Sequence, residues 1–180
     1  MGEFGAIARD TVVLLVSLGA AVFDVRVRRI PSWLTLPGIA AGFGYWAITS
    51  TPRQFAGVVA VAALTFVVGF LLYAVSILGG GDGKLLTCVA ALEGPALFAE
   101  CVAWMLLAGV VISIAILGWR RALVPLARRI GVSLVDLLRF GIVSNPVEGH
   151  EPHRMPFAVV VLIAVVLTVA SDRTGFRFLR

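Results

Sequence analysis

The chain has 180 residues, of which 60% are hydrophobic and 14% charged, with a formal net charge of +5. A soluble domain of this length could not bury so much apolar surface, so the composition excludes that class and predicts a single all-α integral membrane domain over residues 1–180. The basic residues lie in loops beside apolar runs, where they orient membrane helices, so the charge does not indicate nucleic-acid binding.

Six apolar segments predict a bundle of about six transmembrane helices. In chain order they are 7–23, 33–49, 55–78, 84–98, 101–119 and 155–170. Glu93-Gly94-Pro95 interrupts the fourth segment, which we nevertheless expect to cross the membrane as a short helix.

The first segment is short for a membrane-spanning helix. Asp10 and Asp24 have 13 residues between them, which is about 20 Å of helix against about 30 Å of hydrocarbon. One of these acids must therefore be drawn toward the membrane. Asp24 is the better candidate, because Arg9 can pair with Asp10. On the Asp24 side of this helix, Ser17, Ala20 and Ala21 are small enough to let another helix approach.

The basic residues also predict the orientation. If all six segments cross, the loops after the first, third and fifth helices share one side and hold ten of the 15 basic residues. The positive-inside rule places that side in the cytoplasm. It includes the long loop 120–154, whose leucines and arginines predict an interfacial amphipathic helix.

Two aspartates follow odd-numbered helices and therefore lie on the same membrane face. Asp24 ends the first apolar run, and Asp82 follows an uncharged run that ends in Gly79-Gly80-Gly81. An acid at membrane depth costs about 2.5–3.5 kcal/mol on insertion scales, so it usually has a function. The glycines would let another backbone, such as an extended substrate, approach Asp82.

An aspartic protease requires at least a buried pair of carboxyl groups. One ionised carboxylate takes a proton from water, and the other, protonated, donates to the oxyanion that forms. Asp82 precedes a helix and Asp24 ends one, so helix polarity suggests Asp82 as the base and Asp24 as the initial acid. The opposing interpretation is a pair of solvated interfacial acids balanced by Arg26 and Lys84.

Other site chemistries have weaker support. Residues 79–84 do not fit the spacing of a phosphate-binding loop, and no serine elbow is present. His150 and His153 have a proline between them, which excludes a helical zinc motif. Cys88 and Cys101 are expected to be free packing residues. We therefore expect neither a metal nor a cofactor.

Two motifs carry a resemblance to a known family. Residues 23–35 resemble the first signature of type IV prepilin peptidases, D-x-R-x-x-x-I-P-N-x-L-T, and residues 79–86 resemble the second, G-x-G-D-x-K-L-L. Residues 154–158 look like the R-x-P-[YF] opening of the family's last helix. The resemblance covers about residues 23–170.

The resemblance implies an intramembrane aspartic endopeptidase of the bacterial inner membrane. Such an enzyme removes the short basic leader of prepilins or pseudopilins, after a glycine and on the cytoplasmic face. Its catalytic pair aligns with Asp24 and Asp82. The supporting motif positions align with Pro31, Gly79, Gly81 and Lys84, and the role implied for Lys84 is structural or electrostatic.

The chain departs from the family pattern in two respects. Ser32 stands where the family usually has Asn, and no C-x-x-C zinc ligands are present. Methyl transfer is therefore not expected, and the short peptidase of tight-adherence (Flp) pilus systems fits better. Alternatives are an archaeal preflagellin peptidase, a presenilin-like protease, and a non-catalytic assembly subunit or small transporter. The oligomeric state and the pilin substrate stay open.

Overall fold

The computed structural model describes residues 2–119 and 157–174. The chain divides into two compact units, Met1–Ala108 with Pro156–Arg180, and Gly109–Met155. Both aspartates belong to the first unit. The expected amphipathic helix within 120–154 and the two histidines lie outside the described residues, and the single domain over 1–180 stays a prediction.

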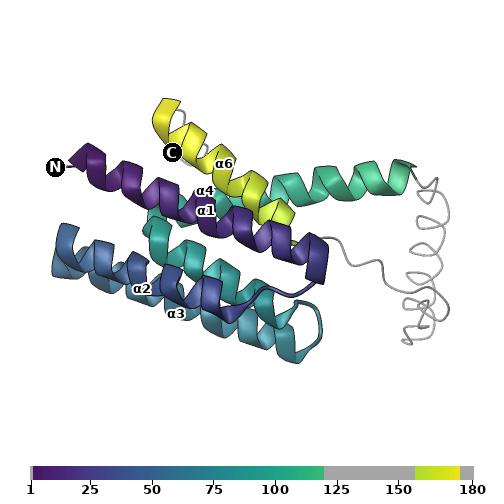
Figure 1. The fold of residues 1–180 in the computed structure, drawn as a ribbon, viewed down its shortest axis with the longest axis horizontal. Coiled ribbons are helices and arrows are strands. Elements are labelled where there is room, and N and C mark those ends of the chain that lie inside the picture. The colour runs from purple at the N-terminus through teal and green to yellow at the C-terminus, as the bar shows by residue number, and fades with distance from the viewer. Residues whose placement is uncertain (1, 120–156, 175–180) are drawn as a thin grey trace, which may run out of the picture. The chain divides into compact units, whose positions relative to one another are not determined.

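The described residues are helical, which confirms the all-α class. In chain order the helices are α1 (Gly2–Val27), α2 (Ser32–Thr49), α3 (Pro52–Ala74), α4 (Gly80–Trp119) and α6 (Phe157–Thr174) (Figure 1). Four of them are long and apolar enough to cross a membrane. The helix α2, which is as long as α6 and has Pro37 inside it, is not among these four.

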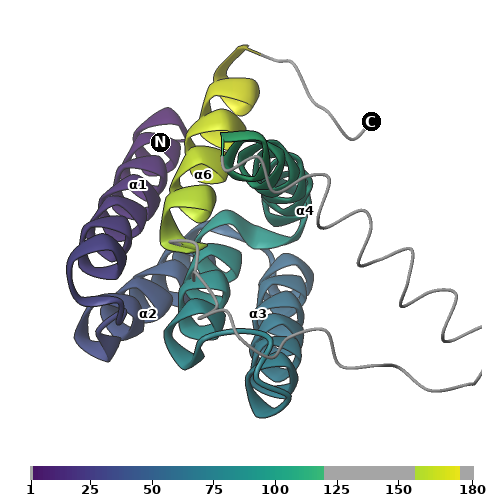
Figure 2. The same cartoon turned by 90° about the vertical axis from the view of Figure 1, so that its right-hand side faces the viewer.

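The prediction of six separate helices is not confirmed, because α4 contains both the fourth and the fifth expected segments. Its backbone leaves helical geometry at Gly94, where φ is 73° and ψ is 177°. The parts of α4 before and after Gly94 run in different directions within the first unit (Figures 1 and 2). Pro95 follows and has no N–H to donate. Next to this break, Trp46 donates its indole N–H to the carbonyl of Leu92 at 3.0 Å.

The core of the first unit forms where α1, α4 and α6 meet. Its fully buried members include Val13 on α1, Leu85 and Val89 on α4, and Val161 and Val165 on α6. Side chains on the outward face of α3 are exposed, as expected for a helix that meets lipid.

The small-residue face of α1 is buried as the sequence predicts. Ser17, Ala20 and Ala21 are all buried, and the two alanines belong to the same core cluster as Ala158 and Ala164 of α6. Small side chains on both helices allow their backbones to approach closely.

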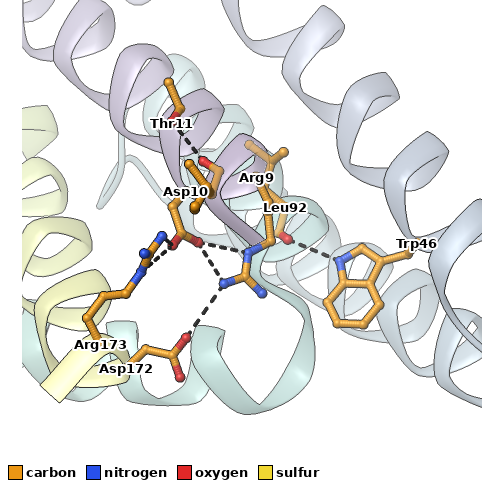
Figure 3. Close-up of polar contacts among 8 residues, drawn as sticks. Arg9, Asp10, Thr11, Trp46, Leu92, Asp172 and Arg173 are labelled. Atoms are coloured by element: carbon orange, nitrogen blue, oxygen red, sulfur yellow. Dashed lines mark hydrogen bonds and ion pairs between the residues drawn. The ribbon is translucent and has the colours of Figure 1, made fainter. Parts of the chain in front are cut away.

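A polar cluster joins α1 to α6 near the chain ends (Figure 3). Asp10 is only 4% exposed, and Arg9 contacts its carboxylate at 2.7 Å, which confirms the expected pair. Arg173 of α6 contacts the other oxygen of Asp10, also at 2.7 Å. Arg9 also lies 3.8 Å from Asp172. Two cations thus compensate one buried carboxylate.

The break in α4 predicts a difference between two glycine substitutions. A Cβ on Gly94 would lie 2.7 Å from Cζ2 of Trp46, in a backbone region that favours glycine. We expect Gly94→Ala to lower the free energy of unfolding by about 1–3 kcal/mol or more. Gly44→Ala is the matched control, because a Cβ there meets no atom within 4 Å. Unfolding in detergent micelles should separate the two variants, and equal stabilities would contradict this account.

Candidate active site

The first aspartate lies in the last turn of α1. The helix ends at Val27, and Arg28 adopts a left-handed φ of 54°. The N–H of Arg28 donates to the carbonyl of Asp24 at 3.0 Å, which closes the helix end. Pro31 is extended (φ −73°, ψ 137°) and immediately precedes α2. Asp24 therefore comes just before a tight link between two helices.

The second aspartate lies in the first turn of α4. Gly79 precedes the helix, and its N–H donates to Oδ2 of Asp82 at 3.1 Å. This bond returns from the third helical position to the residue before the helix, as in one half of a capping box. A Cβ on Gly79 would lie 2.7 Å from the same Oδ2. The glycine therefore makes room for the Asp82 carboxyl.

The two motif segments contact each other at two points. A Cβ on Gly81 would lie 3.0 Å from Cβ of Ile30 and 3.2 Å from its backbone nitrogen. The ammonium of Lys84 donates to the hydroxyl of Ser32 at 2.9 Å. At Gly81, the backbone that approaches closely is therefore the chain's own link before α2. The sequence had suggested an extended substrate in this place.

Asp24 has a partner that sequence reasoning missed. The backbone N–H of Ala158, at the start of α6, donates to Oδ2 of Asp24 at 3.1 Å. First-turn N–H groups have no partner inside their own helix, so an acid nearby satisfies one of them. The motif at 154–158 was the available signal, but it did not indicate which side chain α6 would meet.

This contact adds a second helix end to the argument that assigned acid and base from helix polarity. That argument placed Asp24 only at the end of α1, yet it also lies at the start of α6. Asp82 lies at the start of α4. Both carboxyls accept a backbone N–H beside a helix N-terminus, but Asp24 also lies in the last turn of α1, where the helix dipole disfavours negative charge, so the acid and base roles stay a prediction.

The surroundings also bear on the alternative of balanced surface acids. Both aspartates are partly buried. Within 2–119 and 157–174, the ion pairs found join Arg9, Asp10, Asp172 and Arg173, and none involves Asp24. Lys84 contacts Ser32, and its expected structural role fits this bond.

The described residues show no arrangement of three or more His, Cys, Asp or Glu side chains that could hold a metal. The expectation of a site without metal or cofactor stays a prediction. Cys88 and Cys101 are free and buried, which confirms their expected role as packing residues.

The contact between Lys84 and Ser32 predicts energetic coupling between the two segments. Lys84→Met and Ser32→Ala each remove this one hydrogen bond, so the double variant should lose less stability than the sum of the two single variants. We expect a coupling energy of about 0.5–1 kcal/mol, because the lysine is exposed. Unfolding midpoints of the four proteins in one detergent measure it, and strict additivity would mean that the bond contributes nothing.

Comparison with known proteins identifies the family but gives no closer relative. No curated protein and no solved structure matches the chain. The model of the type IV leader peptidase family matches residues 11–118, which is more than half of the chain and includes both aspartate segments. The chain therefore belongs to the type IV leader peptidase family.

Proposed function

We propose that the protein is an aspartic endopeptidase that removes the leader peptide from type IV prepilins or pseudopilins. The observation that carries the proposal is the meeting of the two aspartate segments, through Ile30 against Gly81 and Lys84 against Ser32. These contacts join the segments that contain Asp24 and Asp82, which are 58 residues apart in the sequence, and both aspartates are partly buried. Family membership supplies the reaction class.

In the proposed reaction, Asp24 and Asp82 act on one water molecule. The ionised carboxylate takes a proton from water while the water oxygen bonds to the carbonyl carbon of the substrate, and the protonated carboxyl gives its proton to the carbonyl oxygen. Collapse of this intermediate breaks the C–N bond, and the proton taken from water passes to the leaving amine. The N–H groups of Ala158 and Gly79 orient the two carboxyls for these transfers.

The same two bonds have a purely structural interpretation, in which both aspartates cap helices. Asparagine separates the two interpretations, because its side-chain oxygen still accepts a backbone N–H but the amide does not exchange protons as a carboxyl does. A capping role would therefore largely survive the substitution, whereas a catalytic role would not.

We expect Asp24→Asn and Asp82→Asn each to reduce leader cleavage by about a hundredfold or more while insertion and folding persist. The measurement is the gel shift of a co-expressed tight-adherence prepilin. Asp172→Asn is a control, because Asp172 belongs to the polar cluster at the other end of α1 and α6. It should cleave at the native rate.

The outcomes distinguish the alternatives. Continued cleavage by either active-site variant would remove that aspartate from the mechanism. A panel of prepilins left uncut by the native chain would favour the non-catalytic assembly subunit or transporter. A preflagellin cut in preference to every prepilin would favour the archaeal enzyme.

We further propose that the protein resides in the bacterial inner membrane with its site toward the cytoplasm, as the arginine distribution suggests. The lack of C-x-x-C ligands supports a peptidase without methyltransferase activity. Mass spectrometry of the processed pilin should therefore give an N-terminus without a methyl group. A methylated product in cells that contain no other prepilin peptidase would contradict this assignment.

A further inference from the structure

A buried glutamate that the proposed reaction does not use lies directly before the break in α4. Glu93 is only 3% exposed, and its Oε2 has no hydrogen-bond partner among the residues that the structure describes. None of the ion pairs found within 2–119 and 157–174 involves this carboxyl. A buried polar atom without a partner is rare in proteins, so its presence requires an explanation.

The charged side chains around Glu93 make a negative charge there unfavourable. Arg9 and Asp10 act on it from α1, Asp172 acts from α6, and Glu100 acts from the part of α4 beyond the break. These neighbours are three acids and a single cation. The cation already has other partners, since Arg9 contacts Asp10 at 2.7 Å and lies 3.8 Å from Asp172 (Figure 3). Glu93 is therefore not compensated by an ion pair of its own.

Two further neighbours bring no positive charge to this place. Cys101 of α4 lies within electrostatic range of Glu93, and Trp46 of α2 donates its indole N–H to the carbonyl of the preceding residue, Leu92. The described part of the chain also shows no group of three or more acidic, His or Cys side chains that could hold a metal. A carboxylate here would be a buried charge surrounded mainly by other acids, whereas a bound proton makes the group neutral.

We propose that Glu93 is a proton-binding site, and that its proton allows the break in α4 to pack against α1 and α6. Without the proton, Asp10 and Glu100 would repel the carboxylate. It could then reach water only if the segment of α4 that ends at Gly94 moved away from the other two helices. That segment carries Asp82 at its start. The inference does not depend on the proposed function, because it concerns the folded chain and no substrate.

The proton can be observed in the infrared spectrum, where a protonated carboxyl and a carboxylate absorb at different frequencies. In membranes at about pH 7, where a glutamate in water is ionised, the native chain should show the C=O stretch of a protonated carboxyl. Glu93→Gln should lack this band. Glu100→Gln is the matched control, because Glu100 is equally buried on the same helix but accepts the hydroxyl of Ser171, and it should keep the band. Identical spectra for the native chain and Glu93→Gln would overturn the inference.

The pH dependence of stability gives a second readout. A group that binds a proton in the folded protein and releases it on unfolding makes the folded state less stable as the pH rises. Above about pH 4.3, the ratio of folded to unfolded native chain should fall relative to that of Glu93→Gln, by up to about tenfold per pH unit. Unfolding of both proteins in one detergent at several pH values measures this ratio. Parallel curves would contradict a proton bound at Glu93.

Neutral substitutions keep the inference testable through folding alone. Glu93→Gln and Glu93→Met both lack a negative charge, and methionine adapts well to irregular space in a core. We expect both variants to insert and fold. If neither folded, the negative charge of Glu93 would be required, with Arg9 as its partner, and the inference would be wrong. A native stability that depends on sodium or potassium at constant ionic strength, and loses this dependence in Glu93→Gln, would assign the site to a cation and would also overturn it.

Discussion

The candidate site depends on the contact between Ile30 and Gly81. This contact exists because position 81 has no side chain and because Pro31 holds the short link before α2 in an extended conformation. A Cβ at position 81 would lie 3.0 Å from Cβ of Ile30, so a larger residue there would crowd the link that connects α1 to α2. Because Gly81 has no side chain, two segments that are far apart in sequence can be in close contact there.

The other glycines of the motif act differently, although they belong to the same short run. Gly79 admits the carboxyl of its own neighbour Asp82, and Gly83 admits the backbone of α3 at Gly69. The G-x-G-D-G stretch therefore serves three separate contacts, to the first motif, to the catalytic candidate and to a neighbouring helix. These three contacts explain why several glycines occur together around the first turn of α4.

The sequence predicted the features that follow from local chemistry or from the number of membrane crossings between two motifs. The all-α class, the Arg9–Asp10 pair and the free cysteines follow from composition and adjacency, and the meeting of the two motifs follows from counting crossings. The partnership of Asp24 with Ala158 could not be predicted, because it depends on the register between α1 and α6. Ala20, Ala21 and Ala164 belong to the core cluster between these helices, and small residues are compatible with many registers. The break in α4 at Gly94 was also indicated by the sequence, because a Gly-Pro pair normally interrupts a helix.

The two contacts between α1 and α6 have a mechanical consequence. Asp10 holds Arg173 near one end, and Asp24 holds the N–H of Ala158 near the other. Thirteen residues of α1 lie between Asp10 and Asp24, and the two are about 21 Å apart along the helix axis. A helix pair pinned at both ends and packed through small side chains between them resists sliding and rotation. The two helices are therefore expected to move together as one rigid pair that carries Asp24, whereas the backbone break at Gly94 separates the segment of α4 that carries Asp82 from the rest of that helix.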